Sequence, residues 1–384
     1  MTSGPAYHVL FLDAGIEMQC GVGQFTRRLA ETIERLAPGT TTTLSLTREA
    51  GTPAEIWRAV GSAQNVVCNF PIVAWKRVVI APLFALAIAR LRGRRVILLQ
   101  HEWAGLHWLR RLTYMPALLL ADIIVMFSPL VQRELAADPI VGRTARKCVL
   151  APLPPNIEAP ADITESHLYH RLARARAEGQ VVIGHFGSIY PGKQPNALLC
   201  IGAVLAARGM KPLIVYVGSF IRGMDRTEEE FYARAEQLGI RDAVLVSGFI
   251  ASDQEVFGLF SLVDAFCYPL EEGLSARRSS ILACLQSARP VIVTGPAEDD
   301  EFDHHPRFKA LIERGAITLV ARGANEAAYA DAIMAALGRP AAHMPFDFDG
   351  WWIDVARAIR AQFALTPSGE IAPNSASQTP PART

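Results

Sequence analysis

Short apolar segments alternate with segments of helical periodicity along the first half of the chain. Residues 8–14 (HVLFLDA) form one apolar run, and apolar side chains recur at helical spacing in residues 23–36. Further runs, each followed by a helical or loop segment, are NVVCNF, RVILLQ and IIVMFS. Short segments of Val, Ile and Leu that are buried on both faces are typical of parallel sheets. The first half of the chain is therefore predicted to form an α/β lobe.

A proline-rich segment without periodicity, residues 150–163, predicts a linker to a second lobe. The strand candidates VVIGHFGS, LIVYVGS, AVLVSGF, AFCYPL and PVIVT follow it, separated by helical segments, and predict a second doubly wound unit. We expect domains at residues 1–155 and 156–345, a helical segment at 346–365, and a disordered tail at 366–384 that is rich in Pro and Ser. Because α/β proteins bind ligands at the carboxyl ends of their strands, two such lobes predict a binding cleft.

Composition narrows the possible classes of function. A hydrophobic fraction of 51% with 20% charged residues is typical of a globular protein. The net charge of 38 − 37 = +1 argues against nucleic acid as a partner. The six cysteines show no metal-binding spacing and the N-terminus has no signal-peptide pattern, so we expect free thiols and a cytoplasmic location. The longest apolar run, residues 78–89, is shorter than the ~20 residues that span a bilayer.

Two glycine-containing turns are candidates for binding an anion. The loop CGVGQFT, residues 20–26, opens a predicted helix, where Gly21 and Gly23 would let backbone N–H groups approach a phosphate. The segment FGSIYPGK, residues 186–193, places Lys193 after a predicted strand, where an ammonium would meet a phosphate as a point charge. The alternatives are a plain turn for the first segment and a solvated surface lysine for the second.

The segment EEGLSARRSSILACLQSARPVIVT carries the most information. Arg277 and Arg278 stand at the start of a predicted helix, where the helix dipole favours acids, and this conflict indicates an anionic ligand. The alternative is a solvated loop with Ser279 or Ser280 as the N-cap. A further candidate is His101, which follows a predicted strand; its alternative is a structural histidine.

No segment predicts a metal site. Residues 298–305 (EDDEFDHH) lack ordered ligand spacing and are expected to face solvent. Asp347 and Asp349 form an Asp-x-Asp pair, but Asp349 is better explained as the N-cap of the last helix.

A basic segment suggests a membrane or lipid-linked partner. Residues 76–111 carry a charge of 8 − 1 = +7, interleaved with tryptophans and aliphatic residues. That composition suits an anionic membrane surface or a lipid-linked substrate. The alternative is a set of ordinary solvated helix faces.

Taken in order, these segments resemble those of bacterial glycosyltransferases of the GT-B fold, similar to the family 4 retaining enzymes. The resemblance covers roughly residues 8–364 and rests on CGVGQFTRRLAETI, LLQHEWAGLHWLRR, FGSIYPGKQ, VSGFIASDQEVFGLFSLVDAFCYPL and GLSARRSSILACLQSARPVIVT. It implies two Rossmann-like domains facing across a cleft, with the last helix crossing back to the first domain.

The resemblance also implies roles for particular residues. The donor would lie mainly on the second domain, with His101, Lys193 and Glu272 as the catalytic residues. Glu102 and Trp103 would contact the acceptor on the first domain. The donor-binding set would comprise Gly21, Gly23, Gly187, Ser188, Lys193, Glu272, Gly273, Ser275, Arg277, Arg278 and Ser280.

The chain departs from the family pattern in two places. Ser280 or Ala283 stands where relatives carry the second Glu of a Glu-x7-Glu motif, and Ser188 stands approximately where many relatives carry an Arg. We expect Arg277 and Arg278 to replace that positive charge.

The implied activity is a retaining, metal-independent transfer of a sugar, of hexosyltransferase type, from a nucleotide diphosphate sugar, without any further cofactor. The acceptor would be a glycan or a lipid-linked molecule in cell-surface polysaccharide or glycolipid biosynthesis, at the inner face of the membrane. Two alternatives stay open. The missing second Glu fits a non-catalytic GT-B subunit that partners another transferase, and the fold also serves nucleotide-sugar epimerases.

Overall fold

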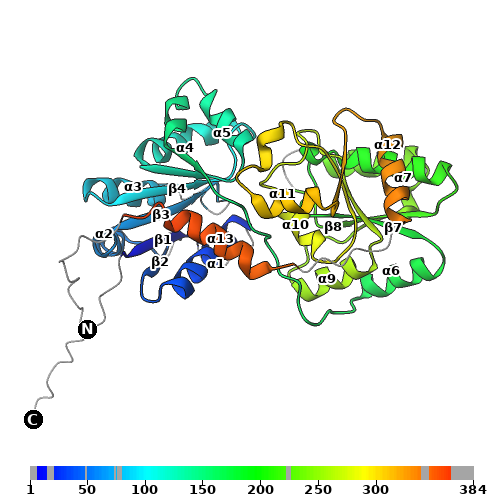
Figure 1. Cartoon of the computed structure of the whole chain (residues 1–384), viewed down its shortest axis with the longest axis horizontal. Coiled ribbons are helices and arrows are strands. Elements are labelled where there is room, and N and C mark those ends of the chain that lie inside the picture. The colour runs from blue at the N-terminus through cyan, green and yellow to red at the C-terminus, as the bar shows by residue number, and fades with distance from the viewer. Residues whose placement is uncertain are drawn as a thin grey trace, which may run out of the picture. The chain divides into compact units, whose positions relative to one another are not determined.

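The computed structural model describes residues 7–14, 21–47, 50–72, 75, 80–221, 226–338 and 346–364. The chain divides into two compact units (Figure 1). Unit 1 comprises the described residues within Met1–Met126, Val131–Val149 and Ala356–Thr384, and unit 2 those within Phe127–Leu130 and Leu150–Val355.

Unit 1 is built on a six-stranded sheet of order β2-β1-β3-β4-β5-β6. The pairings from β2 through β5 are parallel, and the inner strands are buried on both faces. This explains their uninterrupted apolar sequences. The strands are β1 (Val9–Asp13), β2 (Thr41–Ser45), β3 (Asn65–Phe70), β4 (Arg95–Gln100), β5 (Ile123–Met126) and β6 (Cys148–Leu150).

Helices cover both faces of this sheet. In the strand order, β2 lies on one side of β1, and β3, β4, β5 and β6 follow in turn on the other side. Right-handed crossovers between these parallel strands therefore place α1 on one face of the sheet and α2, α3 and α4 on the other. Figure 1 shows α3 and α4 across the sheet from α1, and α3 packs against both α2 and α4. The helices are α1 (Gly21–Leu36), α2 (Pro53–Ser62), α3 (Ile80–Leu91), α4 (Trp108–Leu120) and α5 (Pro129–Ala136).

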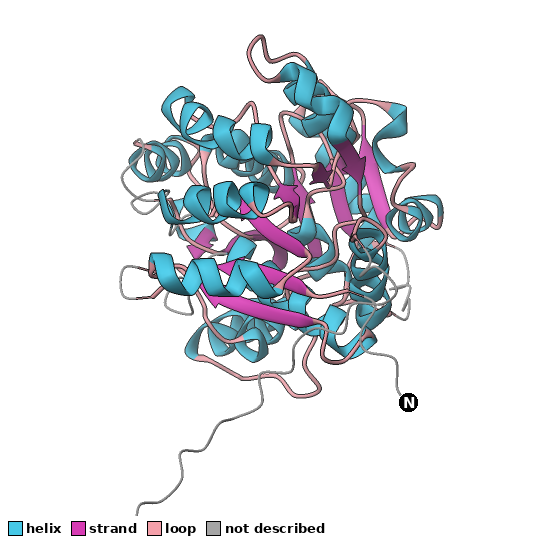
Figure 2. Ribbon diagram, turned by 90° about the vertical axis from the view of Figure 1, so that its left-hand side faces the viewer, coloured by secondary structure: helices cyan, strands magenta, loops and turns pink. Residues whose placement is uncertain are grey.

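Unit 2 repeats this architecture with a six-stranded, all-parallel sheet of order β12-β11-β10-β7-β8-β9. In Figure 2, which draws the whole molecule, helices lie on both sides of the strands. The strands are β7 (Val181–Phe186), β8 (Pro212–Val217), β9 (Val244–Val246), β10 (Ala265–Tyr268), β11 (Val291–Thr294) and β12 (Ile317–Val320).

Two separate apolar cores lie on the two faces of the unit 2 sheet. One contains side chains of α7, α8 and α12, and the other those of α6, α9, α10 and α11. The sheet therefore forms the middle of three layers, as in doubly wound proteins. These helices are α6 (His167–Ala177), α7 (Pro195–Ala207), α8 (Thr227–Gln237), α9 (Asp253–Leu262), α10 (Ser279–Leu285), α11 (Pro306–Glu313) and α12 (Glu326–Leu337).

The last helix, α13 (Phe348–Arg360), begins in unit 2 and ends in unit 1. Beyond it, the Phe363 ring packs on Tyr7, and Ala364 exchanges two backbone hydrogen bonds with the Asn65 side chain, at 3.0 and 2.7 Å. The predicted return of the last helix to the first unit is confirmed. The N-cap prediction was wrong, because Asp347 Oδ1, and not Asp349, accepts the hydrogen bond from Gly350 N at 3.0 Å.

The predicted α/β class is confirmed for both halves. The sequence did not predict β2, β6 and β12, which lie at the sheet edges. The strand β2 reads TTTLS and is half-exposed, so it carries no apolar run. Cys20 and the predicted tail, residues 366–384, lie outside the described residues, and the five other cysteines are free thiols.

Candidate functional site

The turn that follows β7 brings a lysine back against the end of its strand. Gly187 adopts φ +114°, a conformation that glycine favours. A Cβ atom at Gly187 would lie 2.8 Å from Lys193 Nζ, so the absence of a side chain lets the two approach. Residues Pro191–Lys193 then form one 3₁₀ turn before α7 begins. The local backbone thus positions the ammonium group at the carboxyl end of β7.

Lys193 is buried and has no counterion among the residues that the structure describes. Its residue exposure is 8%, and Nζ makes no hydrogen bond or salt bridge with any residue that the structure describes. The nearest ring is that of Tyr190, 5.6 Å from Nζ to the centroid. Burial and, to a smaller extent, the neighbouring Arg278 guanidinium lower the pKa of Lys193 to about 7. Among the described ranges of the chain, no group therefore compensates the charge of this ammonium.

A second loop, residues 271–278, is fixed by close backbone contacts. Gly273 adopts φ +79°. A Cβ atom at this position would lie 2.2 Å from the Gly295 carbonyl oxygen, so a residue with a side chain does not fit there. Leu274 N donates to Thr294 O at 2.9 Å, tying the loop to the end of β11. This hydrogen bond fixes the position of the loop, and therefore of Arg277 and Arg278, which immediately precede α10.

The arginines connect the two loops. Glu272 Oε2 accepts from Arg277 Nη2 at 2.7 Å and from Arg278 Nη2 at 3.3 Å. Arg278 Nη1 donates to the Tyr190 hydroxyl at 3.2 Å, which links this loop to the turn that carries Lys193. The Arg277 and Arg278 side chains are 15% and 11% exposed, whereas that of Glu272 is 48% exposed. Three cations and one carboxylate leave a charge of 3 − 1 = +2 when Lys193 is protonated.

A buried histidine lies beneath these cations. His185 Nδ1 donates to Cys267 O at 3.3 Å, and its ring packs 4.4 Å from that of Tyr268. Burial, with repulsion from Lys193, holds the pKa of His185 well below its usual range. His185 is therefore neutral at pH 7 and supports the site by packing.

Several predicted donor-site residues of unit 2 lie together. A Cβ atom at Gly187 would lie 3.8 Å from Ser280 Cβ, so Ser280 lies beside the Lys193 turn. Ser275 is buried and its carbonyl accepts from Arg278 N at 3.1 Å. Ser188 is exposed and makes no polar side-chain contact in the described structure. Neither Ser279 nor Ser280 caps α10, whose N-cap position is Arg278.

In unit 1, a chain of buried polar groups orients His101 at the end of β4. His101 Nε2 donates to Asn69 Oδ1 at 3.0 Å, and Asn69 Nδ2 donates to Thr26 Oγ1 at 2.7 Å. Asn69 and Thr26 are both fully buried, and the Phe25 ring packs 5.4 Å from the imidazole. Asn69 and Thr26 were not predicted as site residues, although polar residues within apolar strand and helix faces are a recognisable signal.

The other predicted residues of unit 1 differ in their surroundings. No described atom beyond the helix's own turn lies within 4 Å of a Cβ built on Gly21 or Gly23, so packing does not require glycine at either position. Trp103 is 1% exposed, and its Nε1 donates to Asp138 Oδ2 at 3.1 Å. Trp103 is thus a core residue, and the structure does not support an acceptor contact for it. Glu102 is exposed.

The acidic segment was expected to face solvent, and this was wrong for Glu301, Phe302 and His305. Glu301 and His305 are 2% and 1% exposed. Glu301 Oε1 accepts from Ser128 Oγ at 2.6 Å and from Ala276 N at 2.9 Å, so this carboxylate holds the arginine loop. His305 Nε2 donates to Leu153 O at 2.9 Å, and burial lowers the pKa of His305 to about 4. Within the described ranges, no group of three or more His, Cys, Asp or Glu residues could hold a metal ion.

Comparison with known proteins identifies the fold. No family model and no curated protein sequence matches the chain. Among solved structures, HepE from Anabaena in complex with UDP and glucose matches with a TM-score of 0.57 at 14% identity, over 93% of this chain and 95% of that one. A glycosyltransferase from Rickettsia africae matches with a TM-score of 0.56 at 13% identity, over 92% of each chain.

A third match is WaaG, a glycosyltransferase involved in lipopolysaccharide biosynthesis, with a TM-score of 0.52 at 14% identity over 92% of this chain and 94% of that one. Identities this low establish the fold alone. The predicted GT-B fold, with its two Rossmann-like sheets, is thereby confirmed.

Replacing Lys193 by Met should stabilise the protein at low pH. The pKa of Lys193 is about 7 in the folded protein, against an ordinary value of 10.5. The free-energy penalty for burying the ammonium is therefore fully present below pH 7. We expect the unfolding midpoint of Lys193→Met to exceed that of the wild type by about 3 °C or more at pH 6. The gap should narrow between pH 7 and 10.5, because the unfolded wild-type chain binds more protons there.

Thermal unfolding at several pH values measures this difference in unfolding midpoint. Lys211→Met, at an exposed position, is the control and should have the wild-type midpoint at every pH. A gap that is absent at pH 6, or that does not depend on pH, contradicts the assignment of a strained buried ammonium.

Removing the Glu301 carboxylate should loosen the arginine loop. Glu301→Ala leaves Ala276 N and the Ser128 hydroxyl buried without this acceptor. We expect the free energy of unfolding to fall by about 1–3 kcal/mol in denaturant titrations. Asp299→Ala, an exposed neighbour, is the control and should stay within about 0.5 kcal/mol of the wild type. Equal stability of the two variants would remove Glu301 from this role.

Proposed function

We propose that this chain is a retaining glycosyltransferase that uses a nucleotide diphosphate sugar as donor and requires no metal ion. The observation that carries the proposal is the buried Lys193 ammonium beside Arg278, which has no polar partner in the described part of the chain. A net positive charge held out of water favours an anionic ligand. The GT-B fold supports the proposal, and HepE, which shares this fold, was solved with UDP and glucose.

The donor diphosphate would bind to the cations of unit 2. Lys193 supplies a point charge at the end of β7, and Arg277 and Arg278 supply guanidinium groups that suit phosphate oxygens. Glu272, the most exposed member of the cluster, would meet sugar hydroxyls, with Gly187, Ser188, Gly273, Ser275 and Ser280 lining the rest of the donor site.

The same cations would act on the transition state. When the bond between the anomeric carbon and the diphosphate oxygen breaks, negative charge grows on the leaving diphosphate. Fixed positive groups stabilise this charge more than they stabilise the ground state, which raises the rate. The acceptor hydroxyl attacks the face that the diphosphate leaves, and a diphosphate oxygen takes its proton. The anomeric configuration is retained and no protein nucleophile is needed.

Unit 1 would contribute the remaining contacts. His101, held by Asn69, would contact the donor sugar, and the first turn of α1 at Gly21 and Gly23 would meet the diphosphate. Glu102, which is exposed, would contact the acceptor. We further propose a hexose as the transferred sugar and a glycan or lipid-linked acceptor in cell-surface polysaccharide or glycolipid assembly, in line with the role of WaaG.

The test begins with thermal stabilisation by a panel of UDP- and GDP-sugars, since a ligand that binds the folded state raises its unfolding temperature. The stabilising donor is then incubated with candidate glycan and lipid-linked acceptors in excess EDTA, and release of the nucleotide diphosphate is measured. We expect acceptor-dependent release that EDTA leaves unchanged. Lys193→Ala should lower turnover by about 10²–10³-fold, and the exposed Lys211→Ala should not.

The outcomes separate the proposal from its alternatives. Failure of every nucleotide sugar to bind would favour a non-catalytic partner subunit. A changed sugar formed from the donor alone would favour an epimerase. Loss of activity in EDTA would contradict metal independence, and wild-type turnover in Lys193→Ala would remove Lys193 from the mechanism.

A further inference from the structure

Exposed apolar side chains concentrate on three neighbouring helices of unit 1. Among the exposed large hydrophobic residues of the described chain, eight lie on α2, α3 and α4, and the others are scattered. Single exposed apolar residues are ordinary, but a group of them marks an interaction site. The eight are Trp57, Ile80, Phe84, Leu91, Trp108, Leu109, Leu112 and Leu119.

Six of these residues form two matching stripes. On α3 they are Ile80, Phe84 and Leu91, and on α4 they are Trp108, Leu112 and Leu119. Both sets have the spacing i, i+4 and i+11, which places each set along one side of its helix. Because α3 and α4 pack against each other, we call these six residues the α3–α4 face.

Positive charge surrounds the α3–α4 face. Neither α3 nor α4 contains an acidic residue. Arg90 pairs with Asp122, but the other arginines on and directly after these helices make no salt bridge in the part of the chain that the structure describes. Those arginines are Arg92, Arg94, Arg95, Arg110 and Arg111.

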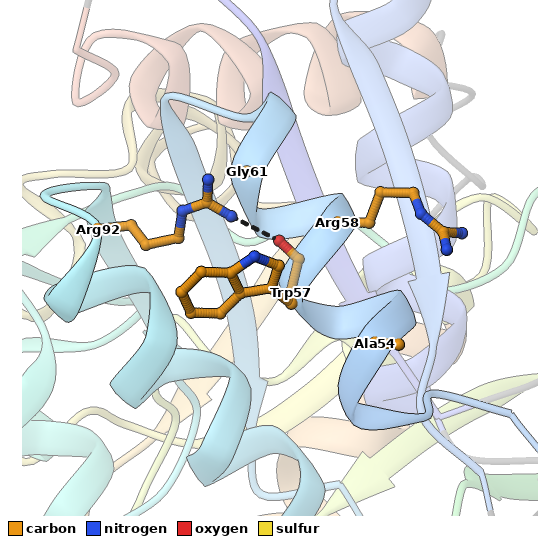
Figure 3. Close-up of a pocket in the computed structure, with 5 residues that line it drawn as sticks. All are labelled: Ala54, Trp57, Arg58, Gly61 and Arg92. Carbon is orange, nitrogen blue, oxygen red and sulfur yellow. Dashed lines mark hydrogen bonds between the residues drawn. The ribbon is translucent and has the colours of Figure 1, made fainter.

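A shallow hollow of about 540 Å³ adjoins α3, lined by Ala54, Trp57, Arg58, Gly61 and Arg92. Figure 3 shows Arg92 lying along the Trp57 ring, with Arg58 pointing away from it. The Arg92 guanidinium lies 4.5 Å from the ring centroid and donates to Trp57 O at 2.8 Å. The hollow therefore combines an aromatic surface with a positioned cation.

We infer that the α3–α4 face and the hollow beside Trp57 bind the surface of an anionic phospholipid bilayer. Apolar side chains at the level of the headgroups leave water, while the arginines meet lipid phosphates. Aromatic and basic residues together are typical of such interfacial contacts. None of the described helices is long and apolar enough to cross a membrane.

The placement of this surface fits a membrane-bound acceptor. The helices α3 and α4 begin after the carboxyl ends of β3 and β4, and His101 directly follows β4. Ile80 and Trp108, the first residues of these helices, therefore lie towards the carboxyl ends of the strands, where His101 also lies. The bilayer contact is nevertheless independent of the proposed sugar transfer, because it depends only on this surface.

The test is sedimentation of the full chain with vesicles of phosphatidylcholine alone or with about one third phosphatidylglycerol, at about 0.1 M salt. We expect binding to the anionic vesicles, weaker binding to the neutral ones, and a loss of binding as salt rises. Two double variants, Phe84→Ser with Leu112→Ser and Arg110→Glu with Arg111→Glu, should each lower the partition coefficient at least about tenfold.

Matched controls are Phe249→Ser and Arg322→Glu, which change exposed residues of unit 2 and should bind as the wild type does. Circular dichroism checks that every variant is folded. The inference is overturned by absence of binding, by equal binding to neutral vesicles, or by double variants that bind like the controls. It is also overturned if the wild type forms a dimer that both double variants abolish, because a second copy would then cover this face.

Discussion

The constraint on which the unit 2 site depends is a buried ammonium that has no counterion within the described segments of the chain. Lys193 lies in a low-dielectric environment beside Arg278, and both groups disfavour protonation of His185 beneath them. Glu272 forms salt bridges with both arginines and offsets one of their two positive charges, but it has no salt bridge to Lys193. A bound dianion would relieve this repulsion. The electrostatic free energy that burial costs the free protein would then add to the binding of a diphosphate, and to the stabilisation of the negative charge that grows on it as it leaves.

The surrounding structure holds the cations where this exchange can take place. Gly187 lets the lysine turn back on its strand, and Gly273 lets the arginine loop pass close to β11. Glu301 fixes the loop backbone through Ala276, and Tyr190 joins the two loops through Arg278. Fixed groups of this kind need little reorganisation during reaction, which is the physical basis of electrostatic catalysis.

The fold could be predicted from the sequence because parallel strands that are buried on both faces consist of uninterrupted apolar residues. The prediction failed at β2, where an edge strand of threonines buries little, and at Trp103, because sequence does not tell whether an aromatic residue after a strand points into the core. Lys193 was proposed as a site residue because it follows a strand, and the paired arginines because they stand at a helix start, where the helix dipole disfavours cations. Glu301 was missed because its partner Ser128 lies 173 residues away, and no local pattern reports such a contact.

The most direct test is the protonation of Lys193 itself, followed by NMR in protein carrying isotope-labelled lysine and assigned by Lys193→Met. The account predicts a pKa of about 7 in the free protein and a clear increase when UDP or inorganic pyrophosphate binds. A Lys193 pKa near 10.5 in the free protein, or one that ligand binding leaves unchanged, would contradict it.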